Sequence, residues 1–73
     1  SNIAEGTARN TSKAVLNSLD ISLGESFELE TQAIIANRVG LLDHKTFNEI
    51  EADISEVQRM IHGFMQTLES NPY

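Results

Sequence analysis

Glu30 is the acidic residue of this chain whose surroundings best suit chemistry. It lies in a helix-forming stretch, near the middle of an apolar face that also carries Phe27 and Ile34. A carboxyl group there could transfer a proton or bind a metal ion, but a buried carboxylate is costly unless a donor or cation pairs with it. Acid–base work usually needs a second titratable group as well. We therefore expect Glu30 to be a structural polar anchor, hydrogen-bonded to another helix, with Asn2 as one donor.

The two histidines complete no metal-binding motif. Helical di-iron sites use Glu-x-x-His pairs, whereas Leu41 stands three residues before His44 and Arg59 three before His62. The chain has no cysteine, which excludes thiolate sites and disulfides. It has no glycine-rich phosphate loop. These patterns predict no catalytic residue, no metal and no cofactor.

The helix that follows Glu30 in the chain has a regular apolar pattern. Its apolar residues are separated alternately by three and four positions, the spacing of a helix that packs along one seam. Asp43 suits the N-cap, because its carboxylate can accept a bond from a free first-turn N–H. We predict a helix over residues 44–69. The seam residues are Phe47, Ile50, Ile54, Val57, Ile61, Phe64 and Leu68.

A second long helix is predicted over residues 12–39, with Gly40 as the left-handed residue that ends it. The short connection to the next helix predicts an antiparallel hairpin. One broad face of this helix is apolar and includes Leu23 and Phe27. A second apolar set lies on nearly the opposite side, so the helix should be buried on two sides. We expect that second set to form an oligomer interface: Ile21, Ile35, Val39 and Leu42.

The start of the chain predicts a break between helices. Residues 1–6 are typical of the end of an upstream helix, because glycine commonly follows the last helical residue. Residues 7–10 are then a linker, and the hydroxyl of Thr11 or Ser12 caps the next helix. Residues 1–73 are predicted to form a single helical domain, part of a larger one.

The charge of the chain is strongly acidic. Five Lys and Arg residues face eleven Asp and Glu residues, a formal net charge of −6. Phosphate binding needs clustered Lys and Arg, so the composition does not favour nucleic acid. No apolar run approaches the ~20 residues of a membrane span, and no secretory signal is visible. We expect a cytoplasmic protein that does not enter a membrane.

Two motifs resemble a known family. They are Ser-Asn-Ile-Ala-Glu-Gly at residues 1–6 and Leu-Asp-Ile-Ser-Leu-Gly-Glu-Ser-Phe-Glu-Leu-Glu-Thr-Gln at residues 19–32. They are similar to motifs of the four-helix-bundle proteins encoded in intervening sequences of bacterial 23S rRNA genes. The same superfamily includes the accessory variability proteins of diversity-generating retroelements. The likeness covers nearly the whole chain in the right order, although Glu25 stands where the family often has Ser.

The resemblance implies a fold and an assembly. In the family, the first motif ends the second helix, and the other lies in the third helix of the bundle. The family's first helix and most of its second, with its arginines, would then lie outside this chain. The family is homopentameric, which agrees with a helix apolar on two sides. Retroelement members are taken to bind reverse transcriptase and nucleic acid through a basic surface, and the acidity of this chain departs from that.

We therefore predict an all-α fold, an antiparallel helical hairpin that forms the C-terminal half of an up-down four-helix bundle in an oligomer. The predicted function is a non-enzymatic oligomeric interaction protein, linked to RNA or a reverse-transcriptase complex by resemblance alone. One alternative is a purely structural oligomer that binds another protein. The other is a carboxylate-based enzyme or metal site around Glu30, which a second inward acid or histidine would favour.

Overall fold

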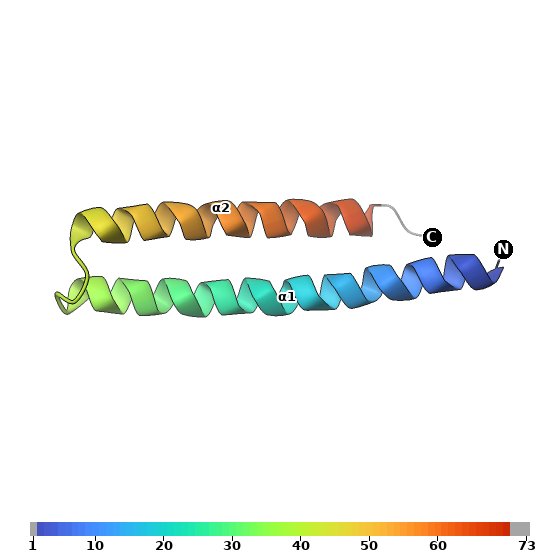
Figure 1. The fold of residues 1–73 in the computed structure, drawn as a ribbon, viewed down its shortest axis with the longest axis horizontal. Helices are drawn as coiled ribbons and strands as arrows, with labels where there is room; N and C mark the ends of the chain where they lie inside the picture. The colour runs from blue at the N-terminus through green and yellow to red at the C-terminus, as the bar shows by residue number, and fades with distance from the viewer. Residues whose placement is uncertain (1, 71–73) are drawn as a thin grey trace.

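Two long helices joined by a short turn make up the computed structural model, which describes residues 2–70. Helix α1 spans Asn2–Arg38 and helix α2 spans His44–Glu69. They lie side by side and run in opposite directions (Figure 1), in a molecule that measures 58 × 15 × 11 Å. The prediction of an all-α hairpin is confirmed for the described residues.

Helix α1 is continuous through the stretch where a break was predicted, so that prediction is wrong. The hydroxyl of Thr11 does not cap a new helix: it donates a bond of 2.9 Å to the carbonyl of Thr7, one turn earlier. Thr7 does the same toward Ile3, at 3.0 Å, and Glu5 and Arg9 form an exposed ion pair one turn apart. A glycine inside a helix costs only about 1 kcal/mol relative to alanine, so one glycine does not end a helix whose other residues favour it.

Gly40 ends α1 as predicted. Its φ is 82°, a left-handed conformation that glycine adopts without a steric cost. The N–H of Gly40 donates to the carbonyl of Asn37 at 3.2 Å, and the N–H of Leu41 donates to the carbonyl of Ala36 at 2.9 Å. This pair of bonds is the Schellman motif, which satisfies carbonyls left free at a helix end.

Asp43 then starts α2 as its N-cap. Its carboxylate accepts a bond of 2.7 Å from the backbone N–H of Thr46. Asn37 holds the other side of the turn, because its Nδ2 donates to the carbonyl of Leu42 at 3.0 Å and lies 3.0 Å from Nδ1 of His44. Side chains from both helices therefore fix the short connection.

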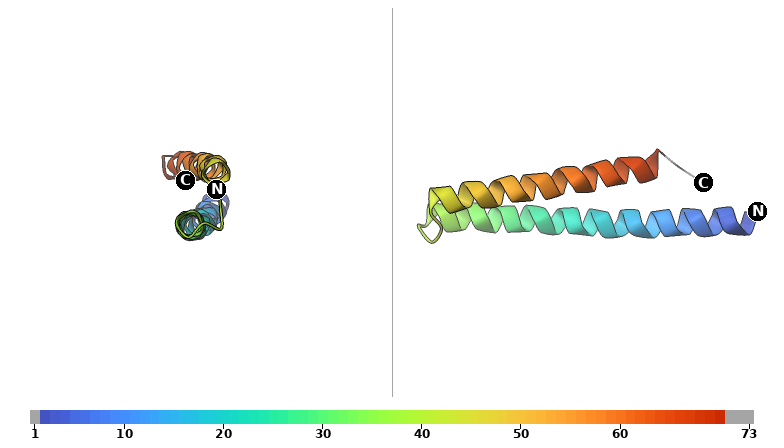
Figure 2. Two further views of the ribbon diagram at one scale, coloured as in Figure 1. Left: turned by 90° about the vertical axis from the view of Figure 1, so that its left-hand side faces the viewer. Right: turned by 45° about the horizontal axis from the view of Figure 1, so that its top comes forward.

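The core between the helices is small. Among residues 2–70, the buried apolar side chains are Leu23, Ala33 and Ile54. Burying a leucine or isoleucine contributes about 1.5–3 kcal/mol, so the intrachain seam holds the hairpin only modestly. The first turns of α1 extend past the end of α2 (Figure 2) and are largely exposed. No helix within the described residues is long and apolar enough to cross a membrane.

Candidate functional site

The two carboxyl groups of Glu30 and Glu51 meet across the helix seam. Glu30 belongs to α1 and Glu51 to α2, and both side chains are half-buried. The pKa of Glu51 is raised above its ordinary value, first because its carboxyl shares a hydrogen bond with Glu30, then because of burial and repulsion between the two charges. Two ionised carboxylates have no proton to share, so this arrangement favours one protonated carboxyl.

The buried oxygen of Glu51 fits this interpretation. Its Oε2 is shielded from solvent and has no hydrogen-bond donor within the described part of the chain. A buried acceptor without a donor costs free energy, and a proton held between the two carboxyl groups would supply one. The sequence analysis singled out Glu30 but missed Glu51, because Glu51 carries no local signal and meets Glu30 only through the register of the helices.

Asn2 cannot serve as the donor for Glu30 that we predicted. Both residues lie in the same continuous helix, α1, and at 1.5 Å per residue they are roughly 40 Å apart along its axis. The N-terminal segment therefore does not fold back onto the middle of α1. The anchor role of Glu30 itself stays a prediction, now with Glu51 as its neighbour.

The face of α1 opposite α2 carries large exposed apolar side chains. Ile21 and Ile35 are each 55% exposed and Val39 is 65% exposed, as expected for residues directed away from the intrachain seam. Leu42 is not part of this face: Val39, just past the end of α1, still donates a helical bond to the carbonyl of Ile35, but the left-handed Gly40 then breaks the helical spacing, and Leu42 is half-buried in the turn. Burial of this face by another subunit stays a prediction.

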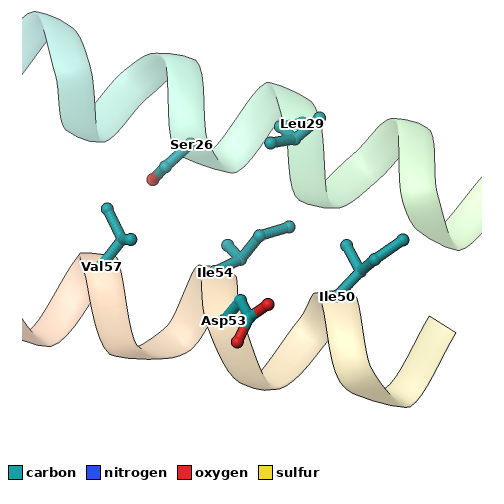
Figure 3. Close-up of a pocket in the computed structure, with 6 residues that line it drawn as sticks. All are labelled: Ser26, Leu29, Ile50, Asp53, Ile54 and Val57. Carbon is teal, nitrogen blue, oxygen red and sulfur yellow. The ribbon is translucent and has the colours of Figure 1, made fainter. Parts of the chain in front are cut away.

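An apolar groove runs between α1 and α2 on one side of the hairpin. Figure 3 shows the aliphatic side chains of Ile50, Ile54 and Val57 directed from α2 toward α1, which carries Leu29, while the carboxylate of Asp53 lies away from α1. Leu29 is 53% exposed and Val57 is 43% exposed. The groove is lined by Ser26, Leu29, Ile50, Asp53, Ile54 and Val57.

The groove forms because the predicted seam residues of α2 do not all pack against α1. Ile54 is buried against α1 as predicted, but Val57, which was also expected in the core, keeps 43% of its surface exposed. Glu51 and Gln58 take seam positions and are half-buried, and Gln58 Nε2 donates a bond of 3.3 Å to Ser26 Oγ. The helix is therefore rotated so that part of its apolar stripe faces the groove instead of α1.

No metal centre forms in the described part of the chain. Within residues 2–70, no three His, Cys, Asp or Glu side chains come together in a group that could hold a metal ion. His44 is held at the turn beside Asn37, and His62 is exposed on α2. The Glu30–Glu51 pair thus has no third ligand among the described residues.

Comparison with protein-family models found a match for this chain. The model of the 23S rRNA-intervening sequence protein matches residues 1–63, which covers α1, the turn and most of α2. Comparison with curated proteins and with solved structures found no match.

Proposed function

This chain belongs to the 23S rRNA-intervening sequence protein family, and we propose that it is a non-enzymatic interaction protein whose helices pack against further helices in an oligomer. The observation behind this is the small core. Within residues 2–70, Leu23, Ala33 and Ile54 are the buried apolar side chains, whereas small domains without disulfides or metals often depend on oligomerisation. The hairpin needs neighbours to bury its remaining apolar surface.

Two separate surfaces are available to such neighbours. The groove, with Leu29 and Val57, can receive helices that complete an up-down four-helix bundle. The opposite face, with Ile21, Ile35 and Val39, can contact another subunit. The resemblance to the family implies that the oligomer has five subunits. Because the two surfaces point in different directions, one hairpin can take part in both contacts at the same time.

The Glu30–Glu51 pair bears on the alternative function, a carboxylate-based enzyme around Glu30. A second acid in the helix seam would favour that alternative. Neither carboxyl lines the apolar groove, and Oε2 of Glu51 is shielded from solvent. A shared proton inside a helix seam can hold two helices together without reacting with a substrate. These facts support a structural role for the pair.

Nothing in the charge distribution favours RNA as the partner. The chain has five Lys and Arg residues against eleven Asp and Glu residues, and two of the five, Arg9 and Arg59, are paired with Glu5 and Glu56. Phosphate contacts need free clustered cations. Association with RNA or with a reverse-transcriptase complex thus depends on the resemblance alone.

The mass of the protein in solution tests the proposed function. We expect light scattering to give a multiple of the 8.1 kDa chain mass, with five copies as the value that the resemblance implies. Ile35→Glu should give a smaller species, because a charge buried in a subunit contact costs several kcal/mol. Asn48→Glu adds the same charge at an exposed position of α2 and should leave the mass unchanged. A parent protein of 8.1 kDa, or an unchanged Ile35→Glu mass, would contradict the proposal.

A further inference from the structure

We infer that the side of the hairpin facing away from the groove docks an acidic helix of another protein, one whose apolar seam is flanked by Asp and Glu. This side, the basic flank, is formed by Phe27, Ile34 and Arg38 of α1 and by Lys45, Asn48, Ser55 and Arg59 of α2. It lies outside the groove and outside the face with Ile21 and Ile35, so this partner goes beyond the proposed packing function.

Helical geometry places Phe27 on the side opposite the groove. One residue further along a helix is a rotation of about 100°, whereas three residues further is about 60° in the other direction. Counted from Ser26, which bonds Gln58 across the seam, Phe27 and Leu29 therefore lie on opposite sides of α1. Leu29 lines the groove, so Phe27 belongs to the other side of the hairpin.

The same relation holds on α2. Ile54 is buried in the seam, and Val57, three residues later, lines the groove. Ser55, one residue after Ile54, therefore lies on the far side. Residues three, four or seven positions apart share a helix face, which adds Ile34 and Arg38 to Phe27, and Lys45, Asn48 and Arg59 to Ser55.

Two free cations lie on this flank beside the turn. Arg38 and Lys45 are exposed, and neither forms an ion pair within residues 2–70. Their chain neighbours Asn37 and His44 are 3.0 Å apart, measured from Nδ2 to Nδ1, so the two cations belong to the same end of the hairpin. Arg59 also lies on the flank but is paired with Glu56.

Acids are nearly absent from the flank, although they dominate the chain as a whole. On the α2 row, the positions three and four apart from residue 45 to residue 62 include no Asp or Glu. On the α1 row, the acid nearest to Phe27 is Asp20, seven residues before it and further from the turn. The part of the flank between Phe27 and the turn is therefore positively charged in a chain of net charge −6.

Phe27 gives this positive surface an apolar anchor. Its side chain is 47% exposed, and Ile34, half-buried, follows seven residues later on the same row. A bound helix presents apolar anchors one or two turns apart, which is the spacing of this pair. Aromatic and arginine side chains also supply much of the binding energy at protein interfaces, and here Phe27 and Arg38 share one row.

The charges favour an acidic helix over the other occupants. In a two-fold dimer the flank would face itself, so Arg38 and Lys45 would be brought toward their own counterparts, and like charges disfavour a complex. Nucleic acid gains its affinity from many phosphate contacts, whereas the flank offers two free cations. A helix with Asp and Glu beside its apolar seam satisfies both the anchor and the cations.

Two synthetic peptides test this contact with the full 73-residue chain. Both have about 20 residues, enough for several helical turns, and the same leucine seam, flanked by Glu in one and by Gln in the other. We expect fluorescence anisotropy to show at least about tenfold tighter binding of the Glu peptide, with the difference shrinking near 1 M salt, where charges are screened within about 3 Å. Equal affinities, or no binding of the Glu peptide, would overturn the inference.

A matched pair of substitutions locates the contact. Phe27 and Leu29 are 47% and 53% exposed on the same helix, but only Leu29 lines the groove. Phe27→Ser should weaken binding of the Glu peptide about tenfold, and Leu29→Ser should leave it unchanged. The reverse result would place the peptide in the groove and overturn the basic flank. Far-ultraviolet circular dichroism checks that the helices remain in each variant.

A second matched pair tests the cations without touching an apolar residue. The double variant Arg38→Gln with Lys45→Gln should weaken the Glu peptide about tenfold. Arg9→Gln with Lys13→Gln removes the same charge from the first turns of α1, where Lys13 lies roughly 20 Å along the axis from Phe27, and should leave the affinity unchanged. Equal losses in both double variants would show an effect of net charge alone and would overturn the assigned site.

The remaining outcomes separate this partner from other occupants and from the proposed function. A single-stranded RNA of about 20 nucleotides, matched in length to the peptides, that binds more tightly than the Glu peptide would show that the flank recognises phosphate, against the inference. A smaller mass of Phe27→Ser in light scattering would show that a second copy covers the flank, which also overturns it. The proposed function is tested separately, by the mass of the Ile35→Glu variant.

Discussion

Ser26 of α1 accepts a hydrogen bond of 3.3 Å from Nε2 of Gln58 on α2. The same hydroxyl donates to the carbonyl of Leu23 at 2.7 Å, so it is used both as donor and as acceptor. This bond shows the register of the two antiparallel helices, because it joins residues that lie opposite each other. With residue 26 opposite residue 58, Ile54 lies opposite Glu30, and the buried isoleucine and the carboxyl pair become neighbours in one seam.

Ile54→Ala should destabilise the protein by about 2–4 kcal/mol, because it removes a side chain that is only 6% exposed and leaves a cavity. Urea unfolding followed by circular dichroism measures the change. Met60→Ala is the control on the same helix, since Met60 is 57% exposed, and its effect should stay within about 0.5 kcal/mol. Equal effects of the two substitutions would show that Ile54 is not core.

Protonation of Glu51 should make the hairpin more stable in mild acid than at neutral pH. The folded protein raises the pKa of Glu51 above its ordinary value of 4.5 through the shared hydrogen bond with Glu30. A group whose pKa is raised on folding binds its proton more tightly in the folded state. Its stabilising contribution is therefore complete below about pH 4.5 and is lost as the pH rises through the raised value. Thermal melts across this range measure the loss.

Glu51→Gln is the variant that isolates this effect. The amide can donate to Glu30 at every pH and removes the repulsion, so the Tm should rise at pH 7 and change little at pH 4. Glu49→Gln removes the same charge at an exposed position of α2 and should leave the pH dependence of the parent intact. If the two variants have the same pH profile, Glu51 and Glu30 do not share a proton.

Asp43→Ala should lower the Tm by removing the N-cap of α2, whereas Asp43→Asn should keep most of it, because Asn caps about as well as Asp. The pKa of Asp43 is held below its ordinary value of 3.8 by the backbone N–H of Thr46, then by the Thr46 hydroxyl. A lowered pKa contributes stability above pH 3.8 that is lost as the pH falls through the folded value. The Asp43→Asn variant should not lose this stability at low pH, because its amide does not titrate. An Asp43→Ala variant as stable as the parent would show that the cap is dispensable.

Much of the hairpin could be predicted because it depends on local interactions. Gly40 and Asp43 act on N–H and carbonyl groups within a few residues of themselves, so turn and cap chemistry can be read from the sequence alone. The apolar residues of α2, spaced three or four positions apart, can likewise be recognised within a single stretch of sequence. The false break after residue 6 has a local cause too, since one glycine costs less than the surrounding helix-forming residues contribute.

What lies across the seam could not be predicted from either helix alone. The apolar stripe of α2 determined that this helix packs, but only the rotation of α2 against α1 decided that Ile54 is buried while Val57 borders a groove. The same rotation brought Glu51 to Glu30, a pairing that no spacing within one helix encodes. The sequence by itself determined where the helices form, because their hydrogen bonds span one turn. Only the tertiary structure decided which side chains meet, because that depends on register and rotation between segments far apart in the chain.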